Sequence, residues 1–462
     1  MEVNMDCVIR NGTIVTAERT LVADIGIQGE KIAAIEPGLE GDKYIDASGF
    51  YVFPGFIDPH VHLQMAIGDL TSSDDFTTGT IAAACGGTTT VIDFTENYRG
   101  DDLLEGVEKR RAQADGKVAV DYALHLTLAD ASERTLVQLP LLAKEGYASA
   151  KLYTTYEGLW LQDGELLRLL AATRDCGILP MVHTENRDAI AYLTAELLRQ
   201  GKTAPKYHPL SRPPLVEAEA ANRVTVLADL VDAPIYIAHL TCQETLERVQ
   251  AARLRGQKVY AETCPQYLLL SQEDYERPGF EGAKFVLSPP LRDRSNWDVL
   301  WLALANNEVQ VVSTDHCPWY YETQKIRGLN SFAEIPNGTP GIETRVPLLF
   351  SEGVGKGRIS LRRFVEICAT ATAKLFGLYP RKGTIAVGSD ADLVIYDPNK
   401  EVTLSYQTLH QRADYCPYEG HTVHGYPRTV LLRGQVIVDD GRFVGQAGQG
   451  QFVLRDTFAF HS

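Results

Sequence analysis

Hydrophobic and polar residues alternate along this chain in two different patterns. Through residues 1–50, short apolar runs such as "CVIRNGTIV" are interrupted by Asn-Gly, Gly-Glu and Pro-Gly pairs, a pattern typical of short strands joined by turns. From about residue 51 the apolar runs recur regularly, and amphipathic stretches separate them. We expect strands there at 51–58, 87–94, 118–128, 148–155, 178–185, 233–241, 258–266 and 308–316.

The amphipathic stretches are predicted helices. Clear examples cover 101–116, 163–177 and 241–256, and each ends in a glycine, as helix C-termini tend to. Repeated strand–helix units favour an α/β fold with a (β/α)8 TIM barrel over a doubly wound sheet.

A second β-rich block follows the barrel region. A helix is expected at 360–378, and strands follow at 391–398 and 428–445. The two β-rich ends of the chain could meet in space as one small β-sandwich. We therefore expect a discontinuous sandwich domain from 1–50 and 385–462, and a (β/α)8 barrel domain at 51–384.

Composition narrows the function classes. The chain has 462 residues with 44 Lys+Arg and 60 Asp+Glu, a formal net charge of −16, which disfavours binding to nucleic acid or an anionic membrane. No signal peptide or membrane-length apolar run is visible. The 8 cysteines are scattered without a CxxC pair, so free thiols and a cytoplasmic location are expected.

Residues with metal-ligand chemistry recur at the predicted C-terminal ends of the strands, where active sites of such barrels are built. The first strand ends in "DPHVH", which places His60 and His62 on one side of an extended chain. One such histidine alone is more often a core or rim residue, but the joint pattern indicates a two-metal hydrolytic site. Its candidate residues are His60, His62, Lys151, His183, His239 and Asp315. Structural roles are expected for His125, His208, His316, His410, His421, His424 and His461.

Lys151 lies in a strand that reads as buried, within "SAKLYTTY". An ion pair with Asp315 would keep an ordinary ammonium there. Beside two divalent cations, however, the amine would be driven neutral and could react with carbon dioxide to give an anionic carbamate. The two oxygens of a carbamate could bridge two metals about 3.5–4 Å apart.

The chain resembles the hydantoinase/dihydropyrimidinase branch of the cyclic amidohydrolases from end to end. The resemblance is carried by "GFIDPHVH", "DDFTTGTIAAACGGTTTVIDF", "ASAKLYTTYEG", "MVHTENRDAI", "ETCPQYL", "LSPPLR", "TDHCP", "IPNGTPGIETR" and "KGTIAVGSDADLVIYDP". It implies two divalent metal ions, Zn²⁺ or else Mn²⁺ or Co²⁺, and a carboxylated lysine (N6-carboxylysine) at Lys151. One metal would be held by His60, His62, Lys151 and Asp315, and the other by Lys151, His183 and His239. A homotetramer is implied as well.

The same resemblance implies roles in ring opening. A hydroxide between the metals would attack the ring carbonyl of a small cyclic amide, Tyr156 would support the oxyanion, and Asp315 would carry the proton to the leaving nitrogen. Ser288 and Asn337 would hold the ring amide through backbone groups, although both could also serve in turns. The expected reactions convert 5-substituted hydantoins to N-carbamoyl amino acids and dihydropyrimidines to N-carbamoyl β-amino acids.

Two alternatives stay open: an allantoinase, and a non-catalytic scaffold such as the metal-free relatives in this family. The scaffold is disfavoured because every ligand is present. Dihydroorotase is disfavoured because it has an arginine directly after HxH, where this chain has Leu63.

An apolar pocket for the exocyclic substituent of the ring is also expected. Its residues fall in segments that should form loops over the site, and each could instead pack at the barrel rim. They are Leu63, Met65, Phe94, Tyr153 and Trp160.

Overall fold

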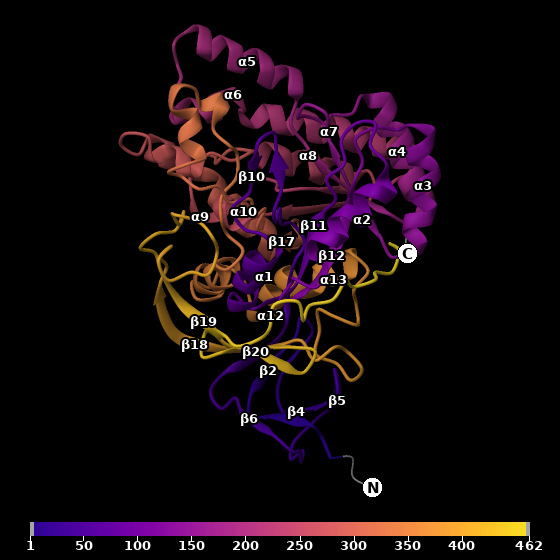
Figure 1. The fold of residues 1–462 in the computed structure, drawn as a ribbon, viewed down its shortest axis with the longest axis vertical. Helices are drawn as coiled ribbons and strands as arrows, with labels where there is room; N and C mark the ends of the chain where they lie inside the picture. The colour runs from indigo at the N-terminus through magenta and orange to yellow at the C-terminus, as the bar shows by residue number, and fades with distance from the viewer. Residues whose placement is uncertain (1–3, 459–462) are drawn as a thin grey trace.

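The protein, a computed structural model that describes residues 4–458, is built around one parallel eight-stranded sheet. Its strands follow one another in chain order and curl into a barrel (Figure 1), so the expected (β/α)8 architecture is confirmed. The strands are β8 (Phe56–Asp58), β11 (Thr88–Phe94), β12 (Asp121–Thr127), β13 (Ser149–Tyr153), β14 (Leu179–His183), β15 (Ile235–Ile237), β16 (Val259–Thr263) and β17 (Val311–Val312).

Helices separate these strands. Their ends carry the expected signals: the Asp102 carboxylate accepts hydrogen bonds from the first turn of α2, and Gly177 ends α4 at φ +68°. The main helices are α1 (Phe76–Cys85), α2 (Leu103–Ala114), α3 (Glu133–Lys144), α4 (Asp163–Cys176), α5 (Arg187–Arg199), α6 (His208–Ser211), α7 (Pro214–Leu230), α8 (Gln243–Leu254), α9 (Pro265–Leu269) and α10 (Ser295–Ala305). Beyond β17 lie α11 (Arg345–Leu349), α12 (Leu361–Val365) and α13 (Ala371–Leu375).

The β-rich ends of the chain do meet. A four-stranded sheet contains β5 (Lys31–Glu36), β4 (Asp24–Gln28), β1 (Cys7–Arg10) and β6 (Tyr44–Asp46). A seven-stranded sheet contains β21 (Arg442–Phe443), β20 (Gln435–Asp439), β19 (Thr422–Leu432), β18 (Leu393–Thr403), β7 (Tyr51–Pro54), β2 (Thr13–Val15) and β3 (Thr20–Val22). One apolar core joins them, with Ile25 and Val52 packed together with Leu393 and Leu431. Figure 1 shows the indigo and yellow strands gathered below the barrel.

The single strand expected at 51–58 is divided. Its first half, β7, pairs with β2 and β18 in the seven-stranded sheet, and only β8 pairs with β11 in the barrel. The division falls at Gly55, where an added Cβ would lie 2.1 Å from Thr89 Oγ1. A glycine is therefore required where the two sheets approach each other. The domain boundaries given above stay a prediction.

Side chains join the first and last barrel strands. The buried Arg345 guanidinium donates through Nη1 to the carbonyl oxygens of Ile57, at 2.9 Å, and Val312, at 2.8 Å. The Asp58 carboxylate accepts from the Thr314 backbone N–H and hydroxyl at 3.1 and 2.6 Å. These contacts fix the spacing of β8 and β17, which lead directly into the candidate ligands.

The remaining expectations from composition concern thiols and membranes. All eight cysteines are unpaired, and every one except Cys176 is buried. Among residues 4–458, no helix combines the length and the apolar character needed to cross a bilayer.

A buried ion cluster links the lower end of the barrel to the seven-stranded sheet. Lys382 Nζ lies 2.7 Å from Asp121 Oδ2, 3.1 Å from Asp390 Oδ2 and 2.5 Å from Asp392 Oδ2, and its side chain is 1% exposed. Burial lowers the pKa of Lys382, but the three carboxylates, Asp392 first, raise it above its ordinary value. Arg433 supplies a second cation to Asp121.

We expect Lys382→Met to lower the free energy of unfolding by about 3–5 kcal/mol, because the three buried carboxylates would lose the cation that they share. Urea-induced unfolding followed by circular dichroism measures this loss. The control is Lys144→Met, which removes an exposed ammonium at the end of α3. Equal stability of the two variants would contradict the role given to the cluster.

Candidate functional site

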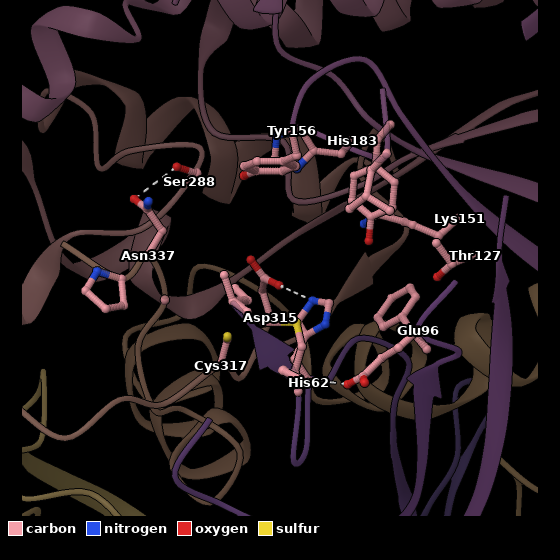
Figure 2. Close-up of a pocket in the computed structure, with 18 of the residues that line it drawn as sticks. His62, Glu96, Thr127, Lys151, Tyr156, His183, Ser288, Asp315, Cys317 and Asn337 are labelled. Carbon is pink, nitrogen blue, oxygen red and sulfur yellow. Dashed lines mark hydrogen bonds and ion pairs between the residues drawn. The ribbon is translucent and has the colours of Figure 1, made fainter. Parts of the chain in front are cut away.

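A cavity of about 560 Å³ opens at the carboxyl ends of the barrel strands. Figure 2 shows Asp315 and His62 near its centre, His183 and Tyr156 on one wall, and Lys151 on another. All six candidate metal ligands line this cavity, and so do Tyr156, Ser288 and Asn337. The barrel topology thus brings together residues that are up to 277 positions apart, His60 and Asn337 being the extremes.

Three of the candidate ligands form one tight group. The ligand atoms of His60, His62 and Asp315 all lie within 4.8 Å of one another. Asp315 Oδ1 is 3.1 Å from His60 Nε2 and 3.2 Å from His62 Nε2. Burial raises the pKa of Asp315, but the two histidines lower it by more, so the pKa of this carboxyl group lies below its ordinary value. An anionic oxygen and two imidazole nitrogens are a ligand set suited to Zn²⁺.

Glu262, in β16, fixes two of the histidines from behind. Its Oε1 lies 2.5 Å from His60 Nδ1 and accepts a hydrogen bond from the His239 backbone N–H at 3.2 Å. The Tyr236 hydroxyl donates to Oε2 at 2.9 Å, and the carboxylate is fully buried. A carboxylate on one ring nitrogen orients the ring and leaves the other nitrogen free for the cavity.

The second group consists of His183 and His239, whose ring centroids are 4.5 Å apart. His183 Nε2 lies 2.8 Å from Glu185 Oε2, and Arg212 Nη1 lies 2.6 Å from the same oxygen. Burial raises the pKa of Glu185, yet Arg212 brings it down to about 2. Burial also lowers the pKa of both histidines, which keeps the imidazoles neutral, as metal ligation requires.

Lys151 lies between the two groups and is 1% exposed. Its Nζ is 3.3 Å from His60 Nε2 and 3.7 Å from Met181 Sδ, and it faces the ring of Phe94 at 5.2 Å. Within residues 4–458 no carboxylate comes within 4.0 Å of this nitrogen, so the expected alternative of an ion pair with Asp315 is not formed. Burial lowers the pKa of Lys151 to about 8, although Glu262 and Asp315 oppose the shift.

Three site residues adopt left-handed backbone conformations. The φ angles are +75° at Tyr156, +35° at His239 and +52° at Asp315. Such a conformation costs a residue with a Cβ on the order of 1–3 kcal/mol. The surrounding packing holds these strained turns, which aim all three side chains into the cavity.

Tyr156, Ser288 and Asn337 lie on the side of the cavity away from Lys151 (Figure 2). Ser288 Oγ is 3.2 Å from Asn337 Oδ1, and the Trp319 indole donates to the Asn337 carbonyl oxygen at 2.9 Å. Burial raises the pKa of Tyr156, so its hydroxyl keeps its proton and can act as a donor.

The expected apolar pocket is only partly present. Met65, Phe94 and Tyr153 line the cavity, but Leu63 and Trp160 do not. Leu63 is fully buried beneath α1, because His60 and His62 face the cavity and alternation turns the intervening and following side chains away. Trp160 is not among the lining residues, and Arg187 stacks on its ring at 4.4 Å. Leu63 and Trp160 therefore do not line the cavity, contrary to the expectation from the sequence.

Most other histidines bond to the scaffold. His125 binds Ser149 Oγ at 2.6 Å and the Pro59 carbonyl at 2.8 Å. His316 contacts Asp74 and accepts from the Gly341 backbone N–H. Further contacts are His208 to the Leu287 carbonyl, His410 to Glu343, His421 to Glu352 and His424 to Glu401. His461 lies outside the described residues.

Known proteins resemble this chain over almost its whole length. The model of the amidohydrolase family matches residues 51–437. The chain belongs to the amidohydrolase family. A D-hydantoinase of Ralstonia pickettii is 49% identical over 453 residues, 98% of this chain and 99% of that protein. A D-phenylhydantoinase of Escherichia coli O1:K1 / APEC is 44% identical, over 98% of this chain and 99% of its own.

Solved structures of the same kind superpose closely on this amidohydrolase. The crystal structure of dihydropyrimidinase from Brevibacillus agri NCHU1002 has a TM-score of 0.97 at 47% identity, covering 98% of this chain and 99% of that one. The L-hydantoinase (dihydropyrimidinase) from Arthrobacter aurescens has a TM-score of 0.89 at 30% identity, covering 98% of this chain and all of that one.

Sequence reasoning missed several residues that this amidohydrolase site depends on. Glu185 follows His183 by two positions at a strand end, so alternation alone could have placed both on one side. Glu262 is a carboxylate within a buried strand, the same signal that drew attention to Lys151. No local pattern marks Lys325, which depends on loops distant in sequence.

Lys325 ties together the two loops that carry Ser288 and Asn337. Its buried Nζ donates to the Val286 carbonyl at 2.9 Å and the Pro336 carbonyl at 3.0 Å. Burial lowers the pKa of Lys325 to about 7, and either protonation state has the two N–H donors that these bonds need.

We expect Lys325→Met to raise KM for a cyclic amide roughly 10-fold and to change kcat less, because it removes two hydrogen bonds that place the loops carrying Ser288 and Asn337, which are expected to bind the ring amide. Steady-state kinetics measures both constants. Lys206→Met, at an exposed position, is the control and should behave as wild type. A fall in kcat at unchanged KM would contradict this positioning role.

Proposed function

We propose that this protein hydrolyses cyclic amides, opening 5-substituted hydantoins to N-carbamoyl amino acids and dihydropyrimidines to N-carbamoyl β-amino acids. The observation that carries the proposal is the convergence of four imidazoles, one carboxylate and a buried lysine on one cavity of an amidohydrolase. Full-length relatives named D-hydantoinase, at 42–49% identity, favour hydantoins over allantoin and favour the D enantiomer.

The cavity suits two divalent cations, with zinc preferred over manganese or cobalt. His60, His62 and Asp315 would hold one, and His183 and His239 the other, with Lys151 between them. The fit rests on neutral buried imidazoles and on the compact group of ligand atoms. When bound, the ions would supply Lewis acidity and would lower the pKa of a water molecule to near neutrality.

We propose that Lys151 is carboxylated in the active protein. Two cations beside an ammonium would repel each other and the lysine, and no carboxylate in the described residues neutralises Nζ. Reaction of the neutral amine with carbon dioxide forms an N–C bond and releases one proton. The product is an anion with two oxygens at the point where both ligand groups meet.

The chain's own residues would then divide the work of ring opening. Asp315, held by His60 and His62, is placed to accept a proton from the attacking water and to return it to the leaving ring nitrogen. The Tyr156 hydroxyl would donate to the carbonyl oxygen as negative charge develops there. Ser288 and Asn337 would hold the ring amide through their backbone groups.

The alternatives explain less. A non-catalytic scaffold would have no need for a buried, ordered ligand set.

A homotetramer is proposed from the family resemblance. Large exposed apolar side chains such as Tyr192, Leu215 and Leu230 are available for subunit contacts.

Turnover on a substrate panel tests this function. We expect zinc-loaded protein to open hydantoin, 5-phenylhydantoin and dihydrouracil, to be inactive after chelation, and to recover when Zn²⁺, Mn²⁺ or Co²⁺ is added. Elemental analysis should find close to two ions per chain. Activity confined to allantoin, or full activity in metal-free protein, would refute the proposal.

We expect Lys151→Ala to hold less metal and to lose measurable turnover, because the bridging anion cannot form. Lys151→Arg should fare no better, since a guanidinium stays protonated and cannot form a carbamate. Reconstitution of apo-protein with zinc should be faster with bicarbonate than in carbon-dioxide-free buffer. An unmodified lysine in the native mass spectrum of fully metal-loaded, active protein would rule out the carbamate.

A further inference from the structure

Glu96 places a carboxylate in the wall of the cavity, where sequence reasoning expected apolar side chains. It lies two residues beyond the end of β11 and lines the cavity, with 14% of its side chain exposed. Its Oε1 accepts from the Ala66 backbone N–H at 3.2 Å, which fixes the hairpin of β9 (Ala66–Ile67) and β10 (Leu70–Thr71). Within residues 4–458, Oε2 has no hydrogen-bond partner.

The charges around Glu96 do not cancel. Among residues 4–458, Arg110 is the one cation that forms an ion pair with it, at 3.2 Å between Nη1 and Oε1, but Arg110 Nη2 is closer to Asp93 Oδ1, at 2.6 Å. Asp93 is fully buried, and its other oxygen accepts from the Leu63 backbone N–H at 2.9 Å. One guanidinium therefore serves two carboxylates, and the excess negative charge falls on Glu96, which faces the cavity.

Glu96 and the ring-holding residues lie at opposite sides of the cavity. Figure 2 shows Ser288 and Asn337 on one side, Glu96 and Thr127 on the other, and His62 and Asp315 between them. A ring held at Ser288 and Asn337, with its carbonyl at the ligand groups, would direct its exocyclic substituent toward Glu96.

Between the candidate ligands and Glu96, the wall of the cavity is lined by apolar side chains. Phe94 and Tyr153 face the cavity beside the ligands, and Met65, Ile67 and Leu159 complete this stretch of wall. A substituent with an apolar stem and a polar tip would match both parts, because the stem loses apolar area to the wall while the tip meets Oε2.

We propose that Glu96 makes this enzyme select substrates whose exocyclic substituent ends in a hydrogen-bond donor, an ammonium group above all. This rests on the proposed hydantoin-opening function and assigns its substrate class. Glu96 acts on selection and not on the chemical step, so its effect falls on the ratio of kcat/KM between substrates that differ only at the tip of the substituent.

The test compares 5-(4-aminobutyl)hydantoin with 5-pentylhydantoin, used as the same enantiomer, which differ by an ammonium in place of a methyl group. Wild type should prefer the ammonium substrate. Glu96→Gln should lower that preference roughly 10-fold or more, because a charged hydrogen bond becomes a neutral one. Glu96→Gln keeps an oxygen for the Ala66 N–H and for Arg110, so the hairpin contact survives while the charge is lost.

Two further variants complete the experiment. Glu96→Leu should open the pentyl substrate better than wild type does, since Arg110 and Asp93 remain as a neutral pair. Glu108→Gln removes the same charge from an exposed position on α2 outside the cavity and should leave the preference unchanged.

An unaltered preference in both Glu96 variants, or an equal loss in Glu108→Gln, would overturn the inference. Wild-type turnover of unsubstituted hydantoin separates this result from failure of the function itself. If hydantoin is opened but the preference does not depend on Glu96, the selection is wrong and the function stands. If metal-loaded wild type opens no hydantoin, both are wrong.

Discussion

The site depends on a buried amine that forms no ion pair with any carboxylate in residues 4–458. Lys151 Nζ is enclosed by an imidazole, a thioether and two aromatic rings, and the nearest carboxylates have other partners. Glu262 is committed to His60, and Asp315 to His60 and His62. Burial without an ion pair destabilises the ammonium form of Lys151, so the arrangement would be most stable when the proposed metal ions and bridging anion complete it.

Preorganisation comes from the layer behind the cavity. Carboxylates that never face substrate hold the outer nitrogens of His60 and His183, and Arg212 keeps one of these carboxylates ionised. Strained turns at Tyr156, His239 and Asp315 aim the inner atoms. On the other side of the cavity, Lys325 in the same way holds the two loops that carry Ser288 and Asn337, the residues proposed to bind the ring.

Strand ends were predictable from sequence because a parallel barrel gathers them at one mouth, and the six candidate ligands therefore lie together. Details that depend on contacts between distant segments were not. The Pro54-Gly55 pair is a local signal for a break between β7 and β8, but the need for a glycine comes from distant residues, since Thr89 and Asp392 pack against Gly55. Leu63 was placed in the pocket by proximity in sequence, although strand alternation already pointed it away. The incompletely neutralised charge of Glu96 is visible only in the structure, because there Arg110 is shared between Asp93 and Glu96.

Residues 51–58 run without a linker from the sandwich sheet into the first barrel strand. Loss of β7 from its sheet would therefore pull β8, and with it the two histidines that follow, out of register. The Lys382 cluster joins the same two parts from the opposite end of the chain. The sandwich and the barrel are thus expected to unfold as one cooperative unit. Unfolding of the terminal strands would therefore also displace the candidate metal ligands in the barrel.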